Sequence, residues 1–461
     1  MKKTYLTQKL PLIVTLISIL SCSDDPIPEV TENEENTPIV VVSEDQLPQI
    51  EINTLGITIE DEYKIDAVMT ISEDETETFN GKIAIETRGS SSQTFPKKSY
   101  GFETRDATNE DLDVAFFDFP EEEDWILYAP YSDKTLIRNI LMHDLSKDIG
   151  RYSSRTKFVE VSINDSYKGI YILMEKLKRD KNRININKLK IDENSGTSVT
   201  GGYILKIDKS DIGEGAVYNS TNSFVSKHHP NNAYEKVRFL YDYPSKDKIT
   251  TQQKNYISSY VANFEDALAS VNFTNPTIGY DAYINTESFI DYFLLTELSN
   301  NVDGFRISTW LVKDKNEKLS MGPLWDYNLA FGNDDFCNNG ATNVWQHRQN
   351  ERCGGGGPWP IPFWWERLLE DPNYKIKLKE RWLELRGGAL SESNILRKID
   401  TYQKILTNTG ALERNFNTWP ILGEYIWPNI YVGNTYQEEI THLEDWIKDR
   451  IYWLDISIKN L

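Results

Sequence analysis

Residues 299–333 constrain the fold of this chain most, because two acidic turns in this segment flank a predicted hairpin. The first turn contains Asp303 and the second contains Asp326. β-forming side chains occupy residues 307–313, and after a polar turn the hydrophobic pattern resumes at Leu319. A hairpin brings its two ends together, so we expect the two carboxylates to lie side by side. Such a pair suits a divalent cation, although each Asp taken alone is better explained as a turn cap.

Composition narrows the class of protein. The chain has 461 residues, of which 39% are hydrophobic and 12% aromatic, and this balance argues against general disorder. The length fits two or three average domains or one large enzyme core with additions. A formal charge of −21 makes the protein a poor non-specific ligand of nucleic acid, so we predict no nucleic-acid partner.

The first 22 residues have the pattern of a bacterial lipoprotein signal. Lys2 and Lys3 precede an apolar run at residues 10–20, which is too short to span a membrane as a helix. The run ends in Ile-Leu-Ser-Cys, which resembles a lipobox with Cys22 as the lipidated residue. An ordinary secretory signal with an incidental cysteine is the alternative. We therefore expect an exported protein that contacts the membrane through a lipid anchor only.

Residues 23–46 are rich in Glu, Pro and Thr and are predicted to form a flexible acidic tether. The acidic tract directly after Cys22 favours the outer membrane and exposure at the cell surface. The folded domain is expected to span residues 47–461.

The pattern of hydrophobic residues predicts strands first and helices later. Short alternating runs, including one at 57–59, indicate a meandering sheet between residues 50 and 86. A helix ending at Gly150 and a hairpin that delivers Glu175 follow. Another strand is expected at residues 201–208. Helical spacing then predicts five helices, at residues 252–269, 287–298, 374–385, 393–406 and 437–456.

A loop of small polar residues lies between two predicted strands. Arg88 precedes Ser90, Ser91 and Ser92, and Lys98 follows at the start of the next strand. Backbone N–H groups and hydroxyls of such a loop can surround a phosphate, and a Lys nearby can neutralise it. Ser-rich turns are also common in ordinary hairpins, so the loop alone is a weak signal.

A long aromatic loop follows residue 333. Cys337 and Cys353 both lie in it, and for an exported chain we consider a disulfide between them as well as two free thiols. The loop also contains Trp345, Trp359 and the pair 364–365, which precedes an apolar helix and is expected to pack in the core. Loops this long are more often functional than idle.

Most catalytic motifs are missing from the sequence. It contains no G-x-S-x-G, G-x-x-x-x-G-K-[ST], H-E-x-x-H or G-x-G-x-x-G. Its ordered features are a phosphate-type loop, a Lys, a Glu and two Asp turns around a hairpin. Protein kinases have the same order of parts, with a first Asp that positions the acceptor hydroxyl and a later Asp that holds Mg²⁺.

Six collinear blocks between residues 80 and 335 resemble the spore coat protein H (CotH) kinase family. The blocks read RGSSSQTFPKKSYGF, YSDKTLIRNILMHDL, GIYILMEKLKRDKNRI, TGGYILKIDK, NNVDGFRISTWL and GPLWDYNLAFGN. The resemblance implies an α+β, atypical protein-kinase-like fold with an N-terminal strand-rich part and a helical C-terminal part at about 360–461. It also implies ATP and Mg²⁺ or Mn²⁺ as cofactors, with Ser or Thr of a protein substrate as acceptor.

The resemblance also assigns roles to residues of this sequence. Asp303 matches the catalytic Asp of the family, and Asp326 matches its metal-binding Asp, with Asn328 as a further ligand position. Lys98 and Glu175 are assigned as the phosphate-binding Lys and its ion-pair partner. The nucleotide loop that the resemblance implies comprises Arg88, Ser90, Ser91 and Ser92.

Two positions depart from the expected pattern. Many family members have Asp at position 328, whereas this chain has Asn, which is a weaker metal ligand. An ordinary kinase catalytic loop has a metal-binding Asn five residues after its catalytic Asp, and this chain has Ser308 there. The alternative interpretation is therefore a catalytically weak or inactive surface lipoprotein that keeps the scaffold and binds glycan or protein through its Trp-rich loop.

Overall fold

The computed structural model describes residues 46–61, 63–210 and 218–461. The predicted signal, Cys22 and all but the last residue of the predicted tether lie outside the described residues. Residues 44–461 form one of the two compact units into which the chain divides.

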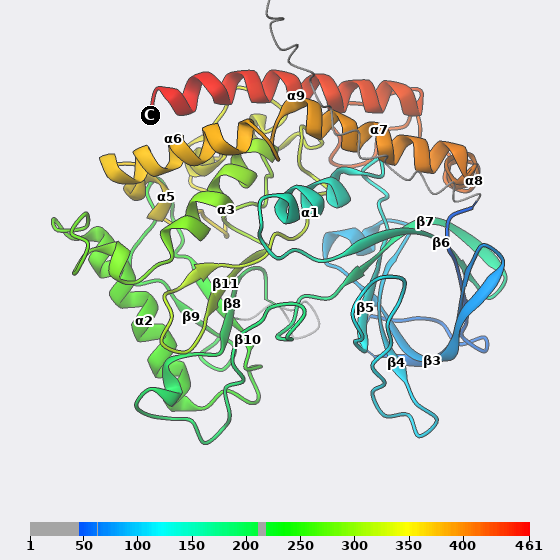
Figure 1. Cartoon of the computed structure of the whole chain (residues 1–461), viewed down its shortest axis with the longest axis horizontal. Coiled ribbons are helices and arrows are strands. Elements are labelled where there is room, and N and C mark those ends of the chain that lie inside the picture. The colour runs from blue at the N-terminus through cyan, green and yellow to red at the C-terminus, as the bar shows by residue number, and fades with distance from the viewer. Residues whose placement is uncertain (1–45, 62, 211–217) are drawn as a thin grey trace, which may run out of the picture. The chain divides into compact units, whose positions relative to one another are not determined.

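Seven strands near the start of the described chain close into a barrel (Figure 1). They pair in the order β1-β2-β3-β4-β5-β7-β6, and β1 closes the barrel by running parallel to β6. The strands are β1 (Gln49–Asn53), β2 (Ile65–Glu73), β3 (Thr76–Arg88), β4 (Ser99–Arg105), β5 (Asp124–Tyr128), β6 (Thr156–Ile163) and β7 (Ser166–Glu175). Alternate side chains such as Ile50 and Ile52 fill the barrel, because successive residues of a strand point to opposite faces.

The structure confirms the predicted strand-rich N-terminal part, with one exception. The strand expected at residues 57–59 does not form. Leu55 and Gly56 both have positive φ (55° and 82°), so the chain turns there instead of continuing as a strand. The predicted hairpin of β6 and β7 is present, and its turn residues Asn164 and Asp165 also have positive φ. Glu175 is the last residue of β7, as expected.

A second sheet holds the predicted hairpin in the order β12-β11-β8-β10-β9. Its strands are β8 (Tyr203–Ile207), β9 (Ser223–Val225), β10 (Arg238–Tyr243), β11 (Thr309–Lys313) and β12 (Ser320–Met321). β11 pairs antiparallel with β8 on one side and with β12 on the other. Thr309 lies opposite Ile207, so the residues just beyond them, Asp208 and Ser308, meet at the same end of the sheet.

Helices make up most of the C-terminal part, which confirms that expectation (Figure 1). The α-helices of the described residues are α1 (Arg138–Asp148), α2 (Thr251–Ala269), α3 (Thr286–Ser299), α4 (Gln349–Arg352), α5 (Trp364–Leu368), α6 (Pro372–Arg386), α7 (Glu392–Asn408), α8 (Ala411–Thr418) and α9 (Tyr436–Lys459). The five helices predicted from spacing are all present, with ends shifted by a few residues. All residues of α3 except Glu287 are buried, because α1, α6 and α9 pack around it. This central helix leads directly into the turn of Asp303.

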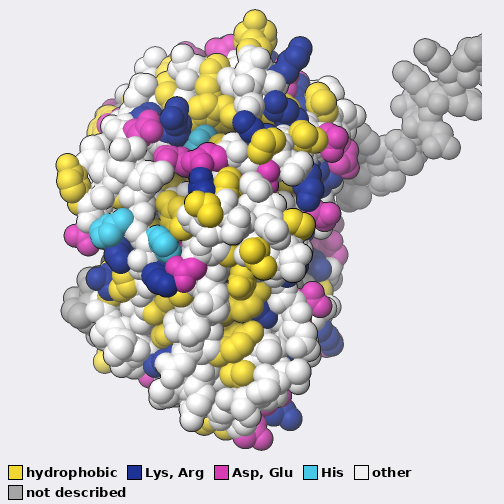
Figure 2. All heavy atoms as spheres, turned by 90° about the vertical axis from the view of Figure 1, so that its left-hand side faces the viewer, with side chains coloured by type: hydrophobic (Ala, Val, Ile, Leu, Met, Phe, Trp, Pro, Cys, Tyr) yellow, Lys and Arg dark blue, Asp and Glu magenta, His cyan; other side chains and the backbone are white. Residues whose placement is uncertain are grey.

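The surface mixes both signs of charge. On the face shown in Figure 2, acidic and basic side chains alternate and hydrophobic side chains are scattered between them. Among the described residues, no helix combines the length and apolarity needed to cross a membrane.

The side chain of Lys97 connects the barrel to α8 through hydrogen bonds. Its side chain is 3% exposed, and its Nζ donates hydrogen bonds to the Ile170 carbonyl at 2.6 Å and to Asn415 Oδ1 at 2.9 Å. The amine also lies 5.0 Å from the centre of the Tyr171 ring. No carboxylate compensates its charge in the described part of the chain, and burial lowers the pKa of Lys97 to about 7.

We expect this buried amine to make stability depend on pH. The pKa of Lys97 is about 7 in the folded state and near 10.5 when the chain unfolds. Between these values the unfolded state binds more protons, so the free energy of unfolding should rise with pH, by up to about 1.4 kcal/mol per pH unit. Urea unfolding at about pH 7 and about pH 9 should show this rise in the natural chain and lose it in Lys97→Met. Parallel pH dependences in the two proteins would contradict the prediction.

A buried ion pair joins the end of α3 to α9. Arg450 Nη2 lies 3.1 Å from Glu297 Oε2, and both side chains are fully buried. Arg450 also donates to the carbonyls of Glu297 and Thr342, and His347 Nδ1 lies 2.7 Å from Glu297 Oε1. Burial alone would raise the pKa of Glu297, but the hydrogen bond and charge of His347, followed by the charge of Arg450, outweigh it and hold that pKa below its usual range.

Removing one partner of this pair should be costly. Arg450→Met removes one partner of a fully buried ion pair and leaves the Glu297 carboxylate without it, so the free energy of unfolding should fall by about 3–5 kcal/mol. Lys448→Met is the matched control, because Lys448 pairs with Asp445 on the exposed face of the same helix and such pairs contribute about 0–1 kcal/mol. Both free energies of unfolding are measured by urea unfolding. Equal losses in the two variants would show that the buried pair stabilises the protein no more than the exposed pair does.

Candidate active site

The two acidic turns of the predicted hairpin meet in the structure. Asp303 lies four residues after the end of α3, and Asp326 lies five residues after β12. Asn301 Nδ2 donates a hydrogen bond to the Asp326 carbonyl at 3.1 Å, which ties the first turn to the second. The Phe331 N–H donates to the Ser299 carbonyl at 2.7 Å, which closes the segment again further along.

The backbone of both turns is strained. Asp326 has φ of +63°, and Phe305 and Ser308 have φ of +70° and +48°. None of them is glycine, so each adopts the left-handed region at an energetic cost. Such residues persist where the surrounding structure fixes them, and they concentrate at functional sites.

Like charges gather around Asp326. Burial, followed by the negative charges of Asp303 and Asp208, raises the pKa of the Asp326 carboxyl to about 7. Lys209 and Arg88 act in the opposite direction without cancelling the effect. The fold therefore holds three carboxylates together where they repel one another, an arrangement that a bound cation would relieve.

Asp208 is a member of this group that the sequence analysis missed. Its Oδ1 accepts a hydrogen bond from the Lys209 N–H at 2.8 Å, and its carboxylate also accepts one from the Ser308 N–H. Burial, and then the charge of Asp303, raise the pKa of Asp208. An ordinary kinase catalytic loop would have a metal-binding Asn at position 308, where this chain has Ser308. The Asp208 carboxylate, which follows β8, lies beside this position.

Asp334 and Arg306 complete the charged surroundings of Asp303. Asp334 is fully buried, and burial raises its pKa to about 7 despite a hydrogen bond from Asn339 Nδ2 at 2.8 Å. Burial lowers the pKa of Arg306, against the charges of Asp303 and Asp334. Neither residue stands out in the sequence, because each becomes informative only once the fold places it near Asp303.

The predicted nucleotide loop borders the acidic group. Arg88 lies at the end of β3 with its guanidinium carbon 5.6 Å from the centre of the Trp325 ring, and its charge acts on Asp326. Ser91 Oγ accepts a hydrogen bond from Lys209 Nζ at 3.4 Å. The loop containing Ser90 and Ser92 therefore faces the residue next to Asp208.

The predicted ion pair of Lys98 with Glu175 is wrong. Lys98 Nζ donates to the carbonyl of Gln93 within its own loop. Glu175 is buried and pairs with Arg155, whose Nη1 lies 2.6 Å from Oε1. The sheet order explains the error, because Lys98 precedes β4 and Glu175 ends β7, and β5 lies between these two strands.

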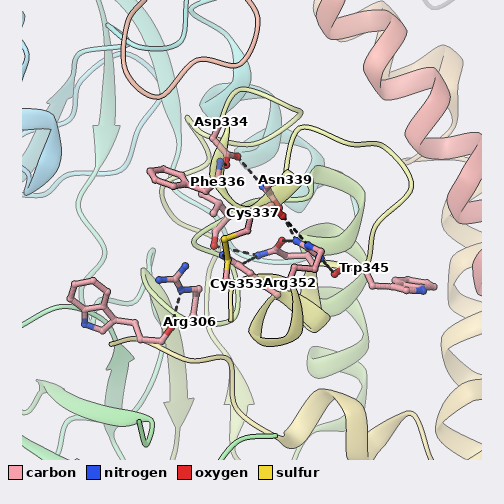
Figure 3. The surroundings of a disulfide bond; sticks show 12 residues. Arg306, Asp334, Phe336, Cys337, Asn339, Trp345, Arg352 and Cys353 are labelled. Atoms are coloured by element: carbon pink, nitrogen blue, oxygen red, sulfur yellow. Dashed lines mark hydrogen bonds between the residues drawn. A yellow bond between two sulfur atoms is a disulfide. The ribbon is translucent and has the colours of Figure 1, made fainter. Parts of the chain in front are cut away.

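A disulfide joins Cys337 to Cys353, the first of the two alternatives left open by the sequence (Figure 3). Arg352, next to Cys353, donates to the carbonyls of Cys337 and Trp345 and to Asn339 Oδ1 at 3.1 Å. Asn339 in turn donates to Asp334 Oδ2. The loop that the disulfide closes thus positions the carboxylate of Asp334, whose pKa the charge of Asp303 raises.

The Trp residues of the long loop divide into two groups. Trp364 and Trp365 are buried in the main core, as predicted. Trp345 packs against Trp453 of α9 with ring centroids 4.9 Å apart. Trp359 instead lies at the site: its carbonyl accepts from Arg306 Nε at 2.9 Å.

A small cavity of about 10 Å³ lies beside Trp359. Asp208, Tyr218, Arg306 and Trp359 are among the residues that line it. Trp359 Nε1 donates to the Tyr218 hydroxyl at 2.9 Å, so the indole is fixed on this side of the acidic group.

The chemistry of the donors suits a hard divalent cation, and in this structure the ligand oxygens of Asp208, Asp303 and Asp326 do not all lie within 4.8 Å of one another. Asp303, Asp326 and Asp208 offer carboxylate oxygens, and Asn328 follows Asp326 by two residues in the same turn. Oxygen ligands of this kind suit Mg²⁺ or Mn²⁺. The Asn328 carbonyl accepts a hydrogen bond from Asn333 Nδ2 at 2.8 Å, which fixes the backbone of that turn.

A second group of carboxylates lies on the barrel, at Asp113, Glu122 and Glu123. Lys178 Nζ lies 2.9 Å from Glu122 and 2.6 Å from Glu123, and it also contacts Asp124 at 2.8 Å. Lys178, together with Arg183 at 3.0 Å from Glu122, already pairs with this group, so we do not assign it a metal.

Two comparisons with known proteins bear on the chain. A search of curated proteins found no match. The family model described as CotH kinase protein matches residues 85–454, which cover most of the chain and include both acidic turns. The match extends through α6, α7 and most of α9, beyond the six blocks that carry the resemblance. The chain therefore belongs to the CotH kinase protein family.

Proposed function

We propose that this protein is an ATP-dependent protein kinase with an atypical kinase-like fold, acting on Ser or Thr of a protein substrate. The observation that carries the proposal is that Asp303 and Asp326 meet beside the predicted nucleotide loop, which contains Ser91. A strand barrel on one side and a mainly helical part on the other agree with a two-part kinase architecture. Family membership supports a kinase-like protein, and the geometry supplies candidates for each role.

The proposed reaction divides the work between the two Asp residues. Asp303 accepts a hydrogen bond from the acceptor hydroxyl and takes its proton as the oxygen attacks the γ-phosphorus of ATP. The bond from that phosphorus to the β–γ bridging oxygen breaks, and ADP leaves with the electron pair. Asp326, with Asn328, would hold a divalent cation, which supplies positive charge to the phosphate oxygens when bound. Ser90, Ser91 and Ser92 would direct hydroxyls and N–H groups towards the phosphates.

The electrostatics of the site support this division. Asp326 has a pKa near 7 because burial and two like charges disfavour its ionised form, so a cation beside it would favour ionisation. Asp303 lies near Arg306, whose carbonyl partner is Trp359.

We propose further that the protein is exported and anchored by lipid at Cys22, at the outer membrane and exposed on the cell surface. The lipobox-like sequence and the acidic tether support this location. The Cys337–Cys353 disulfide also supports it, because disulfides persist outside the reducing cytoplasm.

The alternative role, a surface binding protein without catalysis, relies on the Trp-rich loop. Trp364 and Trp365 are buried and Trp345 packs on α9, which leaves Trp359 as the member of that loop at the site. A single Trp that is already bound to Tyr218 and faces Lys209 is a small surface for a glycan. We therefore favour the kinase proposal.

The kinase proposal predicts transfer of labelled γ-phosphate from ATP to protein in the presence of Mg²⁺ or Mn²⁺. Asp303→Asn keeps the size of the side chain but removes the proton acceptor, so the rate should fall by about 10²–10⁴-fold. Asp326→Asn should abolish both transfer and the metal dependence of ATP binding. Asp113→Asn, in the carboxylate group on the barrel, is the matched control and should retain the rate.

Two results would decide against the kinase. Transfer that persists equally in all three variants would come from a contaminating enzyme. An absence of both transfer and metal-dependent ATP binding in the natural protein would favour the binding role.

A further inference from the structure

Lys209 occupies a position between the two parts of the proposed nucleotide site. It follows Asp208 directly after β8, and its Nζ donates to Ser91 Oγ at 3.4 Å. The same amine lies 5.4 Å from the centre of the Trp359 ring. One cation thus contacts the Ser-rich loop on one side and the aromatic loop on the other.

Among the residues that the structure describes, no single carboxylate takes up the charge of Lys209. In the described parts of the chain it forms no salt bridge, whereas neighbouring Lys206 pairs with Asp242 at 3.2 Å. Its positive charge does act on Asp326, whose ionised form it favours. A Lys with a weak hydroxyl contact and an aromatic neighbour can exchange that contact for a phosphate oxygen at little cost.

Lys98 has a different role in the same loop. Its Nζ donates to the Gln93 carbonyl, five residues earlier, and so closes the loop on itself. The Lys98 carbonyl accepts a hydrogen bond from the Tyr171 hydroxyl at 2.9 Å, which fixes the backbone here. These contacts maintain the shape of the loop and direct the amine towards the loop backbone.

We propose that Lys209, and not Lys98, is the catalytic lysine that binds and neutralises the phosphates of the nucleotide. This inference rests on the proposed function and names a residue for it. In this arrangement the Lys209 ammonium group binds the phosphates between Ser91 and Asp326, the proposed metal ligand. The Trp359 ring keeps the ammonium group within reach, because a cation is attracted to the face of an indole.

The test compares nucleotide affinities of full-length variants in the presence of Mg²⁺, by titration calorimetry with ATP and with adenosine. Lys209→Met should weaken ATP binding by about 10- to 100-fold, the loss expected for one charge-assisted hydrogen bond. It should leave adenosine binding unchanged, because adenosine has no phosphate. Lys209→Arg keeps the charge and should retain most of the affinity for ATP, which separates loss of charge from misfolding.

Two further variants sharpen the comparison. Lys227→Met removes a surface Lys that pairs with Asp266 and should leave ATP binding unchanged. Lys98→Met should shift ATP affinity less than Lys209→Met does. If Lys98→Met instead weakens ATP binding and Lys209→Met does not, the assignment is overturned in favour of Lys98.

The outcome for the natural protein separates the two levels of the proposal. If it binds ATP and Lys209→Met binds equally well, the lysine assignment fails and the kinase proposal stands. If the natural protein binds no ATP, the kinase proposal fails and the lysine assignment fails with it.

Discussion

Repulsion between neighbouring carboxylates is the constraint on which the site depends. Asp303, Asp326 and Asp208 would separate if their backbones were free, because each disfavours ionisation of another. They stay together because β11 pairs with β8 and β12, and because Asn301 joins the two turns. The left-handed backbone at Asp326 is a second unfavourable feature that the surrounding structure maintains. A rigid scaffold keeps this charge arrangement ready for a cation.

The supports of the site come from distant parts of the chain. Glu297 receives Arg450 from α9 and His347 from the long loop, which fixes the end of the helix that leads to Asp303. Asn339 holds Asp334, and Arg306 holds the Trp359 carbonyl. The helical C-terminal part therefore belongs to the functional unit and is more than an appendage, in agreement with the extent of the family match.

Local patterns predicted much of this fold. The helices have clear apolar spacing, and the β6–β7 hairpin has a recognisable turn, so both were found from the sequence. The meeting of Asp303 and Asp326 followed from hairpin geometry, since the two residues lie at the ends of one local unit. By contrast, Asp208 reaches the site through pairing of β8 with β11, across about a hundred residues, and no local pattern indicates that pairing. The error over Lys98 and Glu175 has the same origin, because it required the order of strands in the barrel.

The glycine run before Trp359 shows how the long loop is held. Gly355 and Gly356 have φ of +105° and +72°, and a Cβ at either position would approach within 2.5 Å of Tyr234 or Asn350. Such a run has high conformational entropy in the unfolded chain. The disulfide anchors Cys353 directly before the run, and Pro358 and Pro360 restrict the backbone after it. The chain that passes Arg306 is thus restrained on both sides of the glycine run, and Arg306 binds it through a backbone carbonyl, so this contact uses no atom of the Trp359 side chain.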